Sequence, residues 1–476
     1  MPSKTRQKMQ KLQKNVLQQP FVHYNSDPYR ISDSGFRLSA SKLTTTTIML
    51  TLDITGALAK TITPSLGIPD QELSALRTTM KRNTEDFLRE REKGEHPWSM
   101  DPYDKQAITA VKNAAQYART EKIRQVVWIG IGGSGLGPKV IQEAFESPET
   151  TEFILLDSID PAMIEMNMKL IDWKRALLVI ASKSGGTLEP MSLFFFCFEQ
   201  LKKIMKDRAP QRVIAITDPQ KGILHDFAKE QGIPMLSIPP GVGGRYSIFT
   251  PVGLLPLALL GGDVDSFVEG AKKMDTACQN TVLDESPASL LASVQFLLDT
   301  KRGYPIRVIM PYSKRLESIA RWNQQLIAES LGKTETHNPI PLAAIGTQDQ
   351  HSLLQQWLSG PRKCWHIFIK EESTGSVAVP MEVEESFSYI AGKKFGELLD
   401  ACHQGTSQAL MSAKRPHVTI SLPNFSEESL GQLFFLFLTE VILLGKLYRI
   451  DPYGQPAVEV GKKITKSILS DNETDV

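Results

Sequence analysis

Glycine and hydroxyl residues gather in two short segments that could hold an anion. The first, Gly130 to Gly137, and the second, Ser182 to Thr187, each follow an apolar β-prone run. Glycines let backbone amides approach a phosphate, a following helix adds free N–H groups, and serine and threonine donate hydroxyl hydrogen bonds. Taken singly, each segment could be a tight turn or an ordinary helix cap. Together they predict a pocket for one phosphate, bound by Gly133, Ser134, Ser182, Lys183, Ser184 and Thr187.

The first segment also fits the short fingerprint of a dinucleotide site, Gly130-x-Gly132-x-x-Gly135. Asp157 closes the next predicted strand 22 residues later, where a ribose-binding acid would lie. This match leaves an NAD-dependent dehydrogenase open as an interpretation. The serine and threonine residues of the second segment favour a phosphate monoester instead.

The elements that must position these segments are short apolar runs separated by stretches long enough for a helix. Such runs lie at 126–131, 152–157, 177–181 and 212–217, and again at 306–310, 342–345, 365–369 and 418–422. The alternation is typical of parallel sheets that are covered on both faces. We expect an α/β fold of two αβα sandwich subdomains with mainly parallel, doubly wound sheets, plus an N-terminal helical region.

The predicted organisation has four parts. They are a basic tail at 1–34, a helical region at 35–120 that packs on the large subdomain, a first sandwich subdomain at 121–260, and a second at 261–476 with a C-terminal helical extension. The two halves share a pattern but no visible residue-level repeat. Because ligands collect beyond the carboxyl ends of neighbouring strands, we expect the two phosphate segments to converge.

Composition excludes several classes of protein. The 476 residues are 41% apolar and 22% charged, as in globular enzymes, and 54 basic against 53 acidic residues exclude a generally basic nucleic-acid binder. Cys197, Cys278, Cys364 and Cys402 form no CxxC pair, so we predict no disulfide framework, no structural zinc site and a reducing cytoplasmic location.

Two segments could carry membrane or targeting signals. The most apolar window, Leu433 to Leu444, is too short to span a bilayer and carries Glu440, so we predict a buried helix and no membrane partner. The first twenty residues are basic, but no apolar run follows them, which indicates a solvated tail rather than a secretory signal.

With these segments in view, the chain resembles the phosphoglucose isomerase (glucose-6-phosphate isomerase) family, whose subdomains are of the sugar-isomerase (SIS) type. The matching segments occur in the family's order: Gly243 to Ser247, Trp322 to Lys333, Asp349 to Ser352 and Gln455 to Lys462. About the first hundred residues match no signature. Gly186 stands where the family generally has threonine, which leaves one hydroxyl fewer in the second phosphate segment.

The resemblance implies an enzyme of glycolysis and gluconeogenesis that interconverts glucose 6-phosphate and fructose 6-phosphate. This reaction moves a proton between C1 and C2 through a cis-enediolate, so it needs a base and a nearby positive charge. Glu329 is the candidate base, on a helix face shared with Arg321 and Gln325, and Gln325 can hold its carboxylate. Burial and few competing charges would raise the pKa of a glutamate toward the working pH, where proton transfer in both directions is most efficient. Without the family context, a solvated polar stripe explains the same pattern.

Arg245 lies in a Gly-Gly-Arg turn, where a permanently charged planar donor can stabilise an enediolate. The resemblance gives it that role; taken alone, it could be a surface arginine. Opening the sugar ring needs a further acid and base, and by resemblance these are His351 and Lys462, while Gln325 and Gln455 join the substrate-binding residues.

The resemblance also implies a chain end that folds back over the site, and a homodimer in which each site receives His351 of the partner subunit. The scheme requires no metal, and because it is redox-neutral it requires no other cofactor. A non-catalytic sugar-phosphate-binding regulator of the same fold would lack the base or the arginine, and both are present. A dehydrogenase would leave Glu329, His351 and the second phosphate segment without a role.

Overall fold

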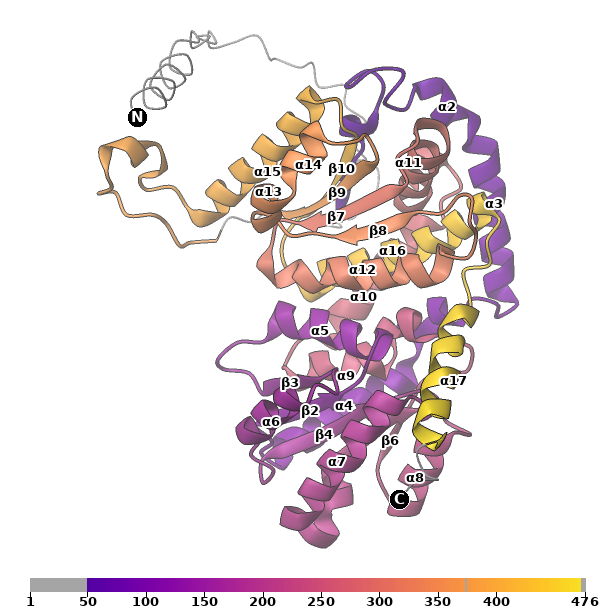
Figure 1. The fold of residues 1–476 in the computed structure, drawn as a ribbon, viewed down its shortest axis with the longest axis vertical. Coiled ribbons are helices and arrows are strands. Elements are labelled where there is room, and N and C mark those ends of the chain that lie inside the picture. The colour runs from indigo at the N-terminus through magenta and orange to yellow at the C-terminus, as the bar shows by residue number, and fades with distance from the viewer. Residues whose placement is uncertain (1–48, 373–374, 472–476) are drawn as a thin grey trace, which may run out of the picture. The chain divides into compact units, whose positions relative to one another are not determined.

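The computed structural model describes residues 49–372 and 375–471, which form two five-stranded sheets with their surrounding helices (Figure 1). The predicted basic tail and the start of the predicted helical region lie outside these residues. The α/β fold class is confirmed.

The first sheet is wholly parallel, in the order β3-β2-β4-β5-β6. Its elements, in chain order, are β2 (Gln125–Ile129), α5 (Gly133–Phe145), β3 (Glu152–Leu156), α6 (Pro161–Leu170), β4 (Ala176–Ala181), α7 (Leu188–Met205), β5 (Val213–Thr217), α8 (Ile223–Gln231) and β6 (Met235–Ser237). Neighbouring residues of β2 enter different cores: Trp128 packs in one cluster and Val127 in another. Both faces of the sheet are therefore covered, which explains why its central strands are continuous apolar runs.

The second sheet has the order β1-β10-β9-β7-β8, with only β1 antiparallel. Its elements are β1 (Thr51–Asp53), β7 (Ile306–Pro311), α12 (Glu317–Leu331), β8 (Ile340–Ala343), α13 (Gln348–Ser352), α14 (Leu354–Ser359), β9 (Cys364–Glu371), α15 (Phe395–Ser412) and β10 (His417–Leu422). In both sheets the second parallel strand lies beside the first, and the third and fourth follow on the other side. This shared winding confirms the prediction that one unit is built twice.

The remaining helices pack around and between these units: α2 (Asp70–Ala75), α3 (Arg77–Glu92), α4 (Lys105–Thr120), α9 (Pro251–Leu259), α10 (Val264–Cys278), α11 (Pro287–Arg302) and α16 (Glu427–Tyr448). Helix α16 contacts α3, α10, α11 and α12, and α4 contacts α9. The N-terminal region is thus helical as expected, except that it also supplies β1. The domain boundaries themselves stay predictions.

Helix α16 is the one helix of the described residues that is long and apolar enough to cross a membrane. Within the structure 94% of its apolar window is buried. Glu440 on this helix is fully buried and pairs with the equally buried Arg307. The predicted buried helix at Leu433 to Leu444 is confirmed.

Helix α5 begins at Gly133, inside the first phosphate segment. Gly132 has a φ of +58°, a conformation that suits glycine, and the helix starts directly after it. Pro138 has no N–H to donate to the carbonyl of Ser134, and the indole of Trp128 donates to that carbonyl instead, over 2.9 Å. The first turn of α5 therefore contains the glycine segment itself.

Candidate active site

The two predicted phosphate segments emerge side by side. Strands β2 and β4 are paired in parallel, with Ile129 opposite Ile180, so the turns that follow them lie at one edge of the sheet. The strand order reverses between β2 and β4, and this is the place where open α/β sheets bind ligands. The predicted convergence is confirmed.

The second segment forms a compact turn before α7. The hydroxyl oxygens of Ser182 and Ser184 accept from the amides of Gly185 and Gly186, over 3.2 and 3.1 Å. Each hydroxyl can therefore still donate its own proton in a hydrogen bond to a ligand. Thr187 is the N-cap residue of α7, and its hydroxyl makes no cap bond to the helix backbone. Gly185 has a φ of +63°, and a Cβ atom there would lie 2.2 Å from the backbone nitrogen of Leu224, so the turn requires glycine.

The first segment touches the Gly-Gly-Arg turn that contains Arg245. A Cβ atom on Gly133 would lie 2.1 Å from the carbonyl of Gly244, so the two backbones are in direct contact. A Cβ atom on Gly132 would lie 2.9 Å from Nε2 of Gln325. The glycines thus bring the first phosphate segment against both the arginine turn and helix α12.

Lys183 joins the second segment to the same arginine turn. Its ammonium donates to the carbonyl of Val242 over 2.9 Å, and burial lowers the pKa of this lysine. This contact gives Lys183 a structural task in the described chain. Its predicted contact with phosphate stays a prediction.

Arg245 lies at the centre of the site and is only 3% exposed. Its Nε donates to Ser330, Nη1 to Glu329 and Gln455, and Nη2 to two backbone carbonyls. The distances are 2.7 Å to Ser330 Oγ, 3.0 Å to Glu329 Oε2, 3.0 Å to Gln455 Oε1, 2.6 Å to Pro452 O and 3.2 Å to Gly454 O. A guanidinium has five N–H donors, so this set of acceptors fixes its plane and position.

Glu329 lies on α12 and is held on both oxygens. Oε1 accepts from Nε2 of Gln325 over 2.7 Å, as the helix spacing predicts, while Oε2 contacts Arg245. Its side chain is 28% exposed, so the carboxylate can still be reached. The guanidinium of Arg245 contacts the carboxylate directly, so a positive group lies beside the candidate base. Arg321 is exposed, and two helical turns, about 12 Å, separate it from Glu329.

The structure does not bring His351 and Lys462 into contact with this group. His351 lies exposed on α13, beyond the carboxyl end of β8, and its side chain makes no hydrogen bond within the described residues. Lys462 lies on the exposed helix α17 (Pro456–Asp471) and pairs with Glu459 over 2.7 Å. The segment just before α17 does reach the site, because Gln455 binds Arg245.

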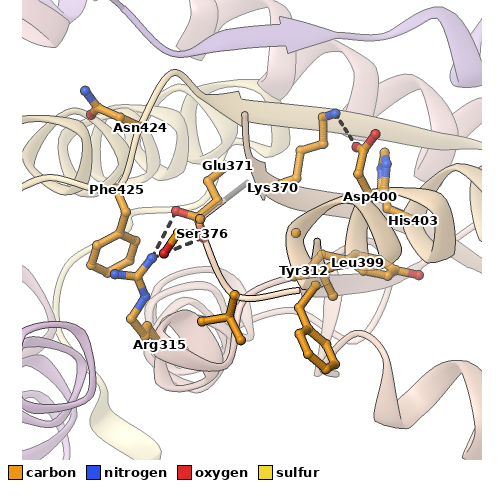
Figure 2. A pocket seen from close by; sticks show the side chains of 14 residues that line it. Tyr312, Arg315, Lys370, Glu371, Ser376, Leu399, Asp400, His403, Asn424 and Phe425 are labelled. Atoms are coloured by element: carbon orange, nitrogen blue, oxygen red, sulfur yellow. Dashed lines mark hydrogen bonds and ion pairs between the residues drawn. The ribbon is translucent and has the colours of Figure 1, made fainter. Parts of the chain in front are cut away.

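The second sheet has a cavity of its own between the carboxyl ends of β7 and β9, with a volume of about 490 Å³ (Figure 2). Its two cations are already paired: Lys370 with Asp400 over 2.7 Å, and Arg315 with Glu371 over 3.1 Å. The Arg315 guanidinium also lies 3.6 Å from the centre of the Phe425 ring. Within the described residues, both cations of this cavity are therefore already bound to carboxylates.

Comparison with known proteins decides the family. A family model described as phosphoglucose isomerase matches residues 104–476. The chain belongs to the phosphoglucose isomerase family. It is 34% identical over 404 residues to glucose-6-phosphate isomerase of Carboxydothermus hydrogenoformans, an alignment covering 80% of this chain and 87% of that one. It is 36% identical over 376 residues to the Rubrobacter xylanophilus enzyme of the same name, with 76% and 87% covered.

Solved structures agree with the fold described above. The crystal structure of a hypothetical protein from Thermus thermophilus matches with a TM-score of 0.80 and 32% identity, covering 88% of this chain and 100% of that one. A glucose-6-phosphate isomerase from Chlamydia trachomatis matches with a TM-score of 0.77 at 20% identity, covering 90% of each chain, which supports the fold. The resemblance inferred from the sequence is confirmed.

Sequence reasoning missed part of this isomerase-family site. The carbonyls of Pro452 and Gly454 bind Arg245, and backbone acceptors leave no signal in residue types. The ammonium of Lys333 donates to two further carbonyls of the same turn, those of Asp451 and Tyr453. Lys333 lies in one of the segments that match the family, and this was the one feature of the sequence that pointed to the turn. Among the described residues, no group of three or more His, Cys, Asp or Glu side chains is arranged to hold a metal ion.

Proposed function

We propose that this chain interconverts glucose 6-phosphate and fructose 6-phosphate at the site around Arg245 and Glu329. Membership of the family and the names of its relatives support the reaction, which belongs to glycolysis. One observation carries the assignment of residues: a carboxylate and a buried guanidinium in contact, beside two donor-rich turns at the strand-order reversal. We also propose a cytoplasmic location, with which the four free thiols agree.

The phosphate group binds to the two turns. The hydroxyls of Ser182, Ser184 and Thr187 and the amides at the start of α5 and α7 surround it, and both helix N-termini favour its negative charge. Gly186 has no hydroxyl to offer at this turn, and its amide donates to the hydroxyl oxygen of Ser184. The sugar then extends toward Arg245 and Glu329, since Gly133 contacts the backbone of the arginine turn.

Glu329 transfers the proton. Its carboxylate takes the proton from C2 of the open-chain aldose and becomes the neutral acid. It then delivers a proton to C1, while the hydroxyl proton on O2 moves to O1, which gives the ketose. Between these steps the cis-enediolate carries a negative charge, which Arg245 stabilises without losing a proton of its own. Gln325 and Arg245 hold the carboxylate in one orientation through both transfers. No metal or nucleotide takes part in this scheme.

Ring opening requires a proton to move from the anomeric hydroxyl to the ring oxygen. We assign this step to His351 and Lys462. His351 is exposed and lacks a hydrogen-bond partner in the described chain, so it is available to a second subunit. Lys462 lies seven residues after Gln455, which is anchored at the site, so a shift of α17 would bring its ammonium over the sugar. We therefore propose a homodimer in which each site uses His351 of the partner subunit.

The reaction is tested with purified protein and fructose 6-phosphate, without added metal or nucleotide, followed by NMR in D₂O. Formation of glucose 6-phosphate with deuterium at C2 is the expected result. Binding of the sugar phosphate without conversion would favour the non-catalytic regulator, and tight NAD binding without isomerisation would favour a dehydrogenase. Either outcome would overturn the proposal.

The shared site is tested by mixing subunits. Glu329→Gln and His351→Ala proteins, each inactive, are unfolded together and refolded. In a hybrid dimer one site combines Glu329 of one chain with His351 of the partner subunit, so random pairing restores about a quarter of the wild-type activity. If each chain uses its own histidine, the mixture stays inactive.

A further inference from the structure

The backbone turn from Asp451 to Gly454 holds Arg245 and is itself held by side chains. Two of its carbonyls, those of Pro452 and Gly454, accept from the guanidinium. Nζ of Lys333, just beyond α12, donates to the carbonyls of Asp451 and Tyr453 over 2.6 and 2.5 Å. The placement of Arg245 therefore depends on the placement of this turn.

The ring of Tyr453 anchors the turn to the N-terminal region. Its hydroxyl lies 2.5 Å from Nδ1 of His96 and 2.9 Å from Nε1 of Trp98, and both of these side chains are at least 95% buried. Nε2 of His96 lies 2.9 Å from Glu90, whose two oxygens both accept from Lys446 over 2.6 Å. A chain of hydrogen bonds thus runs from α16 through α3 to the turn.

The direction of every bond in this chain follows from chemistry. The ammonium of Lys446 keeps Glu90 charged, and a carboxylate can only accept, so Nε2 of His96 carries a proton and donates it to Glu90. In a neutral histidine Nδ1 then carries no proton and accepts from the Tyr453 hydroxyl, whose oxygen accepts from the indole of Trp98. Burial lowers the pKa of His96, which favours this neutral form. Because the bond directions are fixed at Glu90 and at Trp98, this series of hydrogen bonds has one arrangement of protons. The side chain of Tyr453 is therefore held in one position.

We propose that Tyr453 and His96 are positioning residues for the isomerase, which fix the 451–454 turn and through it the guanidinium of Arg245 against Glu329. This inference rests on the proposed function. It also gives the N-terminal region, which matches no family signature in the sequence, a task in catalysis. Arg245 matters most when the enediolate charge develops, so a displaced guanidinium lowers turnover more than substrate binding.

Tyr453→Phe removes the hydroxyl and leaves the ring. We expect kcat for fructose 6-phosphate to fall about tenfold while KM changes by less than about twofold, because a small displacement of a catalytic group lowers the rate steeply. Tyr448→Phe is the matched control: its hydroxyl donates to Asp299 over 2.8 Å and, within the described residues, forms no hydrogen bond with the turn. That control should keep the wild-type kcat.

His96 provides a test that does not depend on how Tyr453→Phe folds. His96→Asn keeps an acceptor near the position of Nδ1 and should retain most of the turnover, whereas His96→Leu removes the acceptor and should match Tyr453→Phe. A variant that combines Tyr453→Phe with His96→Leu should lose no more turnover than either single variant, because both changes break the same series of hydrogen bonds.

An active wild-type enzyme with an equally active Tyr453→Phe variant would refute the positioning role alone, as would equal losses in His96→Asn and His96→Leu. A loss seen in KM with kcat unchanged would refute it as well. An inactive wild-type protein would instead refute the proposed function, so the two failures are distinguishable.

Discussion

Nη1 of Arg245 donates to Oε2 of Glu329 over 3.0 Å, so the two residues assigned to the enediolate chemistry contact each other directly. They are 84 residues apart in the chain and come from different elements. The carboxylate is also bound by Gln325, so both its oxygens are fixed. A base held in this way needs little reorganisation before it accepts a proton, which is where positioned catalysts gain most of their rate.

Glu329→Gln should remove nearly all isomerisation and preserve phosphate-ester binding. The amide has the shape of the carboxylate but cannot accept the proton, and general-base catalysis typically contributes about 10²–10⁴-fold. Steady-state kinetics and calorimetric binding of fructose 6-phosphate measure the two effects. Glu317→Gln, at the start of α12 where this half-buried side chain pairs with Lys314, is the control and should stay active. Retention of more than about a tenth of the activity, or about 1.4 kcal/mol of barrier, would show that Glu329 is not the base.

Arg245→Lys should lower kcat by about 100-fold or more although the charge is kept. Lysine cannot reach the acceptors on both sides of the guanidinium at once, and removal of one oxyanion donor alone typically costs about 10²–10³-fold. Arg321→Lys, which is exposed on the same helix as Glu329, controls for the exchange of residue type. Near-normal turnover in Arg245→Lys would mean that only its charge, and not its fixed geometry, is used.

Ser182→Ala and Thr187→Ala should weaken substrate binding. Each removes one hydroxyl donor to the phosphate, a bond worth about 1.5–3 kcal/mol when the partner is charged, so KM should rise about tenfold or more. Ser192→Ala is the matched control, because that hydroxyl donates to a carbonyl within α7. If kcat fell and the affinity for fructose 6-phosphate did not change, the phosphate would bind elsewhere.

The sequence predicts the central strands well because they are buried on both faces. Such strands become continuous apolar runs, as at Ala176–Ala181, and the winding then brings the two phosphate turns together. β1 and β6 were not predicted: each has three residues and lies at an edge of its sheet, so partial exposure leaves no apolar run.

The site was predictable where residue types carry the chemistry and not where distant segments meet. Gln325 and Glu329 are one helical turn apart, so their contact follows from spacing. The hydrogen bond between His96 and Tyr453 joins residues 357 positions apart, and nothing in either neighbourhood indicates the other. Only the packed fold reveals that the N-terminal region supports the arginine.

Stability should fall as the pH is lowered from about 6.5 toward 4. Burial lowers the pKa of His366 to about 3, and the pKa values of His403 and His417 to about 4, from an ordinary 6.5. Above pH 6.5 these side chains are neutral in both states. Below it the unfolded chain binds protons that the folded chain cannot, so each histidine reduces the free energy of unfolding by up to about 1.4 kcal/mol per pH unit.

The measurement is urea unfolding between pH 7.5 and 5.5. His366→Phe is the informative variant, because both ring nitrogens of His366 lack partners and its ring packs 4.6 Å from that of Trp357. Phenylalanine should raise the stability and make its pH dependence shallower. His337→Gln, at an exposed position, should leave the pH dependence unchanged. The groups facing the three buried rings, and so able to modify the effect, are Asp53, Lys370, Asp400 and Arg415.

Glu143 should link the first phosphate segment to helix α12, which carries Glu329. It lies on α5, which begins at the first phosphate segment, and its carboxylate accepts from the amide and the hydroxyl of Ser318 over 2.8 and 2.6 Å. Ser318 is in the first turn of α12, which has no side-chain cap of its own, so Glu143 replaces the cap from another helix. The two helices pack against each other between the sheets (Figure 1).

Glu143→Ala should therefore reduce the free energy of unfolding by about 1–2 kcal/mol, the cost of losing a helix cap, and should lower kcat as α12 shifts Glu329 relative to the phosphate. Urea unfolding and steady-state kinetics measure the two effects. Combination with Ser318→Ala tests whether the contact is the cause: residues that bind each other give a double variant less destabilised than the sum of the singles, by about 0.5 kcal/mol or more. Strict additivity would show that Glu143 acts through some other contact, and unchanged kcat would show that α12 is held in place without it.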